Sequence, residues 1–287
     1  MTIRNPVEWG VEQVRTAGRA FGSTASTAHP AEAGCPALPE LRRRIEAADL
    51  WDALVKGLDD FGANRTDVIF LCVIYPLIGV VLARLAAGYD MLPLLFPLAS
   101  GFALVGPLAA VGLYEMSRRR EEGHQATWAD AFGVVRSPSF GGIAMLGLLL
   151  VEIFVLWLMA AFAIYHLTLG PKPPISVGAF AHDVFLTPAG WTMIGLGVGI
   201  GFLFAVLVLT ISVISFPLQL DRNVGVEQAV RTSIRAVRAN PGSMALWGLI
   251  VAGALVAGAI PVFIGLVIVL PVLGHATWHL YRKVVPR

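Results

Sequence analysis

The chain has 287 residues, of which 56% are hydrophobic and 14% charged, and its formal net charge is +2. A soluble domain usually has about a quarter of its residues charged, so the composition excludes an ordinary soluble protein. The small net charge gives no reason to expect a nucleic-acid partner, and Cys35 and Cys72 form neither a disulfide framework nor a metal-type spacing. Apolar runs of about 20 residues predict instead an integral membrane protein, whose first partner is the lipid bilayer.

The first 39 residues precede the membrane domain and contain no apolar core of a signal peptide. Asn5 and Pro6 are typical of a helix start, which predicts a short amphipathic helix over residues 1–21. Residues 22–39, rich in Ser, Thr, Ala, Pro and Gly, predict a flexible linker. Both segments are expected in the cytosol.

A second amphipathic helix is expected from Pro39 to Phe61. Its predicted apolar face consists of residues at three- and four-residue steps: Leu41, Ile45, Ala48, Trp51, Val55 and Leu58. This helix packs on the membrane domain from the cytosolic side or, alternatively, lies in the lipid interface.

Within a membrane domain of residues 40–287, six spans are predicted near 68–87, 92–114, 140–167, 191–217, 243–259 and 261–281. Only Arg84 and Lys172 fall on one side of this arrangement, and all other Lys and Arg fall on the opposite side. The positive-inside rule therefore predicts a multi-pass protein of the bacterial inner (plasma) membrane with both termini in the cytoplasm. The fold class is all-α, a polytopic bundle of six transmembrane helices.

An internal repeat is the second organising feature. Each even-numbered span has a proline before a basic end: Pro107, Pro217 and Pro271. The spacing from Pro107 to Arg118 equals the spacing from Pro271 to Arg282. The predicted unit is an amphipathic helix followed by a hairpin of two spans, present three times. Each proline is expected to bend its helix and to free a carbonyl group that neighbouring helices must bind.

Glu152 is the one carboxyl group near the middle of a predicted span. Ionisable residues at such depth are costly and usually face the bundle interior or a wet cavity. One hypothesis is a proton or cation site. The other is a carboxyl group hydrogen-bonded to the fourth span, at Thr210, Ser212 or Ser215.

His275 and His279 lie one helical turn apart, so both rings could approach a metal ion or a haem edge. No glutamate of an HExxH motif and no third ligand accompanies them. Trp278 and Tyr281 beside them favour interfacial anchoring instead. The glycine run at 195–201 follows no strand and favours helix packing over nucleotide binding. We find no nucleophile–base–acid set, so neither a catalytic residue nor a cofactor is predicted.

At several of these motifs the chain resembles the prokaryotic integral membrane proteins of domain-of-unknown-function family 2189. The similar segments cover most of residues 41–283: RRRIEAADLWDALVKGLDDF, FPLASGFALVGPLAAVGLYEMSRRREEG, SVISFPLQLDR, RAVRANPGSMALWGLIVAG and VLPVLGHATWHLYRK. The resemblance implies a multi-span inner-membrane protein without an established activity. Some members of that family carry the label of a cytochrome c oxidase subunit.

Three functions follow as hypotheses. The leading one is a non-catalytic accessory or membrane-organising component, partnered by another membrane protein or a respiratory complex. The alternative is a transporter or permease for a small molecule or ion that uses Glu152. The third is a haem- or metal-binding membrane protein that uses His275 and His279 and is associated with a respiratory oxidase.

Overall fold

The computed structural model describes residues 39–41, 44–63, 84, 92–124, 126–170, 174–261 and 264–286. Every regular element within these ranges is a helix, which confirms the predicted all-α class. The predicted N-terminal helix and most of the linker, and the first span apart from Arg84, lie outside the described residues. The elements are α2 (Ala47–Ala63), η1 (Leu92–Leu94), α4 (Leu95–Leu104), α5 (Gly106–Ala109), α6 (Val111–Glu121), α7 (Trp128–Gly133), η2 (Val134–Arg136), α8 (Phe140–Thr168), α9 (Val177–Leu186), α10 (Pro188–Ser212), α11 (Ser215–Arg222), α12 (Val226–Ala239), α13 (Pro241–Ala259) and α14 (Leu266–Val284).

Among the described helices, three stretches are long and apolar enough to cross a membrane. They are Phe140–Thr168, Pro188–Arg222 and Pro241–Ala259. The first is α8, which agrees with the predicted third span. Its 29 residues extend about 44 Å at 1.5 Å per residue, more than a hydrocarbon core of about 30 Å.

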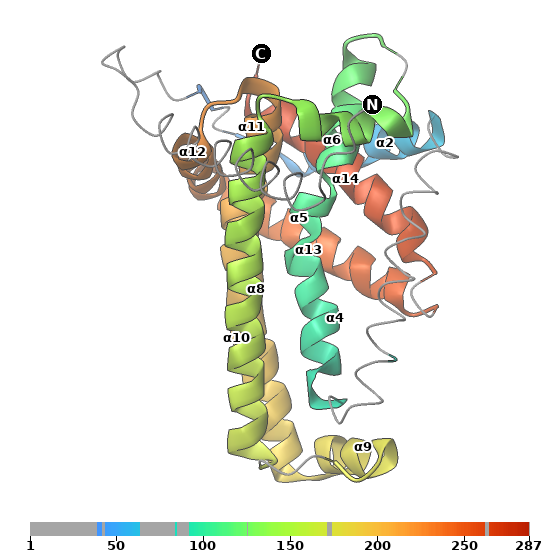
Figure 1. Cartoon of the computed structure of the whole chain (residues 1–287), viewed down its shortest axis with the longest axis vertical. Coiled ribbons are helices and arrows are strands. Elements are labelled where there is room, and N and C mark those ends of the chain that lie inside the picture. The colour runs from blue at the N-terminus through green and yellow to red at the C-terminus, as the bar shows by residue number, and fades with distance from the viewer. Residues whose placement is uncertain are drawn as a thin grey trace, which may run out of the picture.

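The helices α8 and α10 run side by side along the longest dimension of the molecule (Figure 1). Trp157 of α8 joins them, because its ring lies 5.7 Å from the ring of Phe204. The indole N–H of Trp157 also donates to the carbonyl of Pro97 in α4, at 3.0 Å. A Cβ atom on Gly201 would come within 3.0 Å of the Trp157 ring, so this glycine serves helix packing as predicted. At the other glycines of the run, Gly195, Gly197 and Gly199, an added Cβ atom would meet no described residue within 4 Å.

The three repeat prolines are accommodated in three different ways. Pro107 lies in the first turn of α5, just after the α4 helix is interrupted at Val105. Pro217 follows the interruption between α10 and α11. Pro271 lies inside the uninterrupted helix α14. The prolines therefore coincide with helix breaks at two of the three sites, and the threefold repeat stays a prediction.

At the break before Pro217, a side chain from α12 binds the freed backbone groups. The hydroxyl of Ser233 accepts from the Ile214 amide at 3.3 Å and donates to the Thr210 carbonyl at 2.8 Å. Where water is excluded, the backbone N–H and C=O groups at a helix break need hydrogen-bond partners of this kind.

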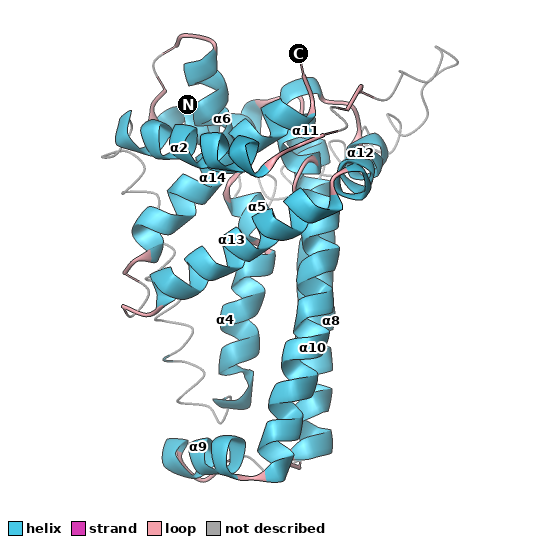
Figure 2. Ribbon diagram, turned by 180° about the vertical axis from the view of Figure 1, so that it is seen from behind, coloured by secondary structure: helices cyan, strands magenta, loops and turns pink. Residues whose placement is uncertain are grey.

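The helices α13 and α14 form an inclined V beside the α8–α10 pair (Figure 2). They approach closely near the turn, where a Cβ atom on Gly265 would lie 2.8 Å from the backbone of Gly258. In all three views the turn of the V ends well short of the level of α9. The last two helices therefore do not extend as far along the molecule as α8 and α10 do.

The face that α2 buries differs from the prediction. Trp51 is 69% exposed, and Val55 and Leu58 are exposed as well, whereas Ala53 and Gly57 are buried. A Cβ atom on Gly57 would lie 2.6 Å from the backbone nitrogen of residue 276 in α14, so the two helix backbones touch here. The buried face of α2 consists of Leu50, Ala53, Gly57, Asp60 and Phe61, and it includes this backbone contact.

The helix α9 was not predicted and lies across one end of the molecule, opposite α2, α6, α11 and the C-terminus (Figure 1). Ser176 caps it by accepting from the amide of Ala179 at 3.1 Å. We call the two ends of the molecule the α9 end and the α2 end.

Candidate functional site

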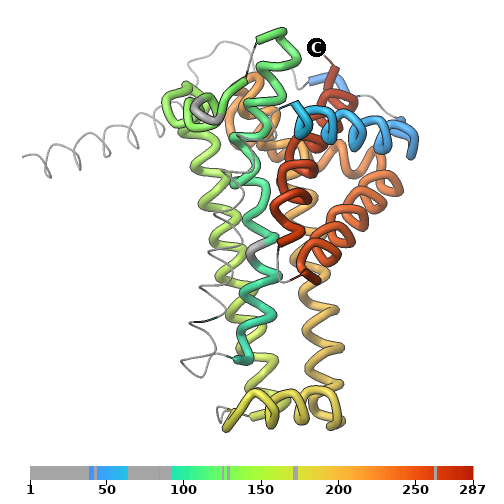
Figure 3. The backbone as a smooth tube through the Cα atoms, turned by 90° about the vertical axis from the view of Figure 1, so that its right-hand side faces the viewer, coloured from blue at the N-terminus to red at the C-terminus, as the bar shows by residue number. Residues whose placement is uncertain are grey.

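The last turns of α14 contact α2, α6 and α11 at the α2 end (Figure 3). Their polar and aromatic side chains and the polar groups that bind them form what we call the α14 junction. It consists of Asp60, Ser117, Arg120, Glu121, Asp221, His275, Trp278, His279, Tyr281 and Arg282.

Asp60, near the end of α2, is the centre of one half of the junction and is only 4% exposed. Its Oδ2 atom accepts from Ser117 at 2.6 Å and from Nε2 of His279 at 2.8 Å. Its Oδ1 atom forms an ion pair with Arg120. Burial raises the pKa of Asp60, but the hydrogen bonds from His279 and Ser117 outweigh it and hold this pKa below its usual value. Asp60 is therefore an ionised carboxylate enclosed by donors.

Ser117 of α6 links this carboxylate to His275, which is fully buried. The single hydroxyl hydrogen of Ser117 goes to Asp60, so its oxygen accepts from Nδ1 of His275 at 2.7 Å. This assigns the proton of the neutral His275 ring to Nδ1. The Nε2 atom of His275 finds no hydrogen-bond partner among the described residues.

The residue types of a serine hydrolase thus meet in the wrong order for nucleophilic catalysis. In a catalytic triad the histidine accepts the serine proton and the acid orients the histidine. Here the serine donates directly to the acid and is itself 1% exposed. The arrangement binds three helices together and leaves no activated hydroxyl group.

The two histidines that sequence reasoning selected do lie in one network, but as donors to protein groups. Nδ1 of His275 binds Ser117, and Nε2 of His279 binds Asp60. The part of the chain that the structure describes holds no group of three His, Cys, Asp or Glu side chains placed to bind a metal ion.

The other half of the junction is centred on Asp221 of α11 and Glu121 of α6. The Tyr281 hydroxyl donates to Oδ2 of Asp221 at 2.6 Å, and Arg282 donates to the same atom at 3.3 Å. Arg282 and the Trp278 indole both donate to Glu121, each at 3.1 Å. The guanidinium of Arg282 also lies 6.0 Å from the ring centres of Trp278 and Tyr281, within cation–π distance.

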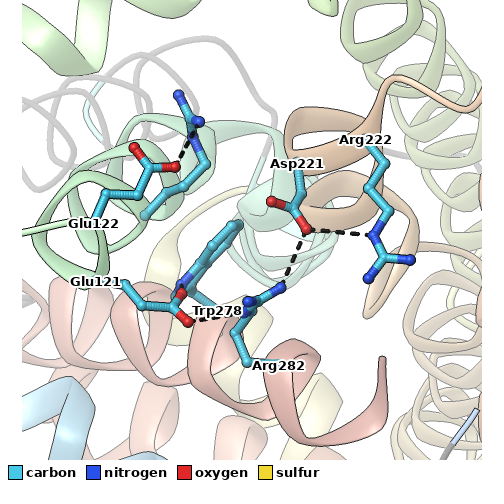
Figure 4. A pocket seen from close by; sticks show the side chains of 7 residues that line it. Glu121, Glu122, Asp221, Arg222, Trp278 and Arg282 are labelled. Carbon is cyan, nitrogen blue, oxygen red and sulfur yellow. Dashed lines mark hydrogen bonds and ion pairs between the residues drawn. The ribbon is translucent and has the colours of Figure 1, made fainter. Parts of the chain in front are cut away.

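These side chains line an open pocket of about 400 Å³ at the α2 end (Figure 4). Acidic and basic groups alternate around it: Arg118, Glu121, Glu122, Asp221, Arg222 and Arg282, with Trp278 as the aromatic wall. Arg118 and Arg282, which the repeat places at equal distances after their prolines, both line this pocket. Its charges are balanced, so it does not select for one sign of ligand.

On the α2 side, Lys283 binds Asp49 at 3.1 Å and Asp52 at 2.8 Å. Burial lowers the pKa of Lys283, but the hydrogen bonds that it donates to Asp52 and Asp49 raise this pKa above its usual value. Lys283 is therefore a charged tie between α14 and α2.

None of the other predicted polar residues takes part in this junction. Glu152 is exposed on the outer face of α8, and no described residue hydrogen-bonds to its carboxyl group. The Thr210 hydroxyl donates to its own helix, at the carbonyl of Val206. Ser212 and Ser215 are buried, and the Ser215 hydroxyl has no partner among the described residues. The expected contact of Glu152 with the fourth span is therefore not formed.

Sequence reasoning missed Asp60, Ser117, Glu121 and Asp221. These residues stand among other charged and polar residues at helix ends, where composition gives no reason to single them out. The available signal was the cluster of His275, Trp278, His279 and Tyr281 on one terminal helix, which requires polar partners wherever that helix is buried.

The comparison with protein families decides the class. Residues 95–221 match the family described as predicted integral membrane protein (DUF2189). The match runs from α4 to the end of α11 and confirms the resemblance there. Together with the apolar helices, it identifies an integral membrane protein. The matched segment includes the junction residues that α6 and α11 contribute, whereas α2 and α14 lie outside the matched segment. Curated proteins and solved structures give no match.

Proposed function

We propose that this chain is a non-catalytic membrane protein, an accessory or membrane-organising component that supports a partner membrane protein or complex. The observation that carries the proposal is the use of polar groups at the α14 junction. Asp60, Ser117 and His279 bind one another across three helices, and Glu121 and Asp221 bind α14 in the same way. Such a network fixes the shape of one surface and needs no substrate.

The surface beside that network suits a protein partner. Its pocket combines arginines with an aromatic wall, and both residue types are enriched where proteins bind one another. The rim residues Glu122 and Arg222 are exposed and lie beside the fixed network. A partner bound here would meet a preorganised surface, which lowers the entropy that binding costs.

The full-length tagged chain, extracted in mild detergent, is expected to co-purify with a second membrane protein in a fixed ratio. Arg222→Glu reverses a charge at the pocket rim and should lower the partner's recovery severalfold. Arg231→Glu is the matched control, because Arg231 pairs with Glu227 on the exposed face of α12, away from the pocket. Recovery of this chain alone, or equal loss in both variants, contradicts the proposal.

We further propose the bacterial inner membrane as the location, with the α2 end and both termini in the cytoplasm. The positive-inside rule supports this orientation, since the basic clusters of α6, α12 and the end of α14 all belong to the α2 end. We propose that α13 and α14 enter and leave on the cytoplasmic side, because their V ends well short of α9. The six-span form with three repeats gives the same orientation of the termini.

Cysteine labelling separates these arrangements. In a chain with Cys35→Ser and Cys72→Ser, an impermeant maleimide added to whole cells should label Ile175→Cys, next to α9. It should not label Ile264→Cys at the turn of the V, although both native side chains are exposed in the isolated molecule. Arg238→Cys on α12 should react only after the cells are opened. Labelling at position 264 in intact cells would instead support the six-span topology. Labelling at position 238 in intact cells would contradict the proposed orientation of the termini.

A further inference from the structure

The outer face of α8 carries a continuous seam of exposed side chains with an alternating three- and four-residue spacing. Its members are Met145, Leu148, Glu152, Val155, Met159 and Phe162. This spacing is the heptad pattern by which two helices pack along their length. The buried residues of α8 lie on the opposite face, against α4 and α10. Among the described residues, therefore, none packs on the seam.

Glu152 occupies the centre of that seam and the interior of the membrane-crossing helix. It lies twelve residues from Phe140 and sixteen from Thr168, or about 18 Å and about 24 Å from the two ends. A carboxyl group at such depth is costly when it faces hydrocarbon. The described part of the chain supplies no hydrogen-bond partner for it, and a helix that packs on the seam would supply one.

We propose that the occupant of this seam is α8 of a second copy of the chain. Copies inserted with one orientation present parallel α8 helices, and a twofold axis along the membrane normal then brings each seam residue opposite its own equivalent. The two Glu152 side chains meet at the centre. As carboxylic acids, they donate to and accept from each other, so the pair satisfies both groups without a cation.

The second copy is favoured over an unrelated partner because the seam is complementary to itself. It offers the same heptad spacing, and its one polar residue carries both a donor and an acceptor. A polar group at one core position of a seam also fixes the register of two helices. The outward glycine face of α10, at Gly195 and Gly199, has open space, but its polar residue Thr192 already donates to the carbonyl of Pro188 in its own helix.

Disulfide crosslinking in native membranes tests this dimer. In the Cys35→Ser, Cys72→Ser chain, Leu148→Cys and Val155→Cys flank Glu152 on the seam and should form dimers under mild oxidation. Leu203→Cys is the matched control. It is 65% exposed on α10, next to Phe204, whose contact with Trp157 places it near the depth of Val155. Equal crosslinking from positions 155 and 203, or crosslinking of position 155 to a different protein, overturns the proposal.

The role of the carboxyl group is tested on the same background. Glu152→Gln keeps a donor and an acceptor and should retain the crosslink of Val155→Cys. Glu152→Leu removes both and should weaken dimerisation about tenfold, the effect of a hydrogen bond of 1–2 kcal/mol between membrane helices. Because the side chain is exposed in the isolated chain, neither change disturbs packing within it. Equal dimer yields from both variants would remove Glu152 from the interface.

Discussion

Gly57→Ala is expected to lower the free energy of unfolding by about 3 kcal/mol, because the added methyl group has nowhere to go. A Cβ atom at this position would lie 2.6 Å from the backbone nitrogen of Ala276 and 2.8 Å from the carbonyl oxygen of Val272. Both are backbone atoms of α14 and cannot rotate away. The substitution therefore separates α2 from α14 and pulls Asp60 away from Ser117 and His279.

Thermal unfolding in mild detergent, followed by tryptophan fluorescence, measures this effect, since Trp278 and Trp247 are buried. Gly62→Ala is the matched control on the same helix, where a Cβ atom would meet nothing within 4 Å. There the alanine should stabilise the helix by up to about 1 kcal/mol. Equal stability of the two variants would contradict the close contact of α2 with α14.

Asp60→Asn is expected to destabilise the protein by about 3 kcal/mol, because it leaves Arg120 and the buried donors around it without their carboxylate. Asp59→Asn is the control, since Asp59 is exposed on the adjacent position of α2. Thermal unfolding of both variants without denaturant, in the same detergent, measures the difference in their stability. A loss at position 59 equal to that at position 60 would contradict the central role of Asp60.

The pH dependence gives a second signature of Asp60. Its folded pKa lies below the ordinary value of 3.8, so the carboxylate stabilises the fold fully above that value. This contribution is lost as the pH falls through the folded pKa. The stabilities of the native chain and of Asp60→Asn should therefore converge in acid, and a constant gap down to low pH would assign the loss to packing instead.

Membrane helices such as α8 were predictable because the run of apolar residues that indicates each one lies within a single segment of the sequence. The uninterrupted apolar run at 140–167 has no alternative to a helix in lipid, and α8 matches it closely. The helix that carries His275 and His279 was predicted from the same kind of pattern, and α14 contains both residues. These features depend on local sequence, and the structure agrees with them.

The partners of those residues were not predictable from the chain alone. Asp60 and Arg120 are sixty residues apart, on α2 and α6, and the packing of both helices against α14 brings them together. Trp51, Val55 and Leu58 do not pack on the described helices, whereas Gly57 makes a backbone contact with α14 that no hydrophobic pattern reveals. The depth of Glu152 in the membrane stays a prediction, and its direction on α8 depends on which face packs against α4 and α10.

The V of α13 and α14 gives the molecule unequal cross-sections along its length (Figure 2). Near the α2 end, α13 and α14 add to the cross-sectional area of α8 and α10. Between the turn of the V and α9, they add nothing to it. A solute that is wider in one leaflet than in the other displaces more lipid from that leaflet, and the bilayer adapts its thickness and shape around it. Among the described helices, the area occupied is therefore smaller between the turn of the V and α9 than near the α2 end, and the surrounding lipid must adapt to that difference.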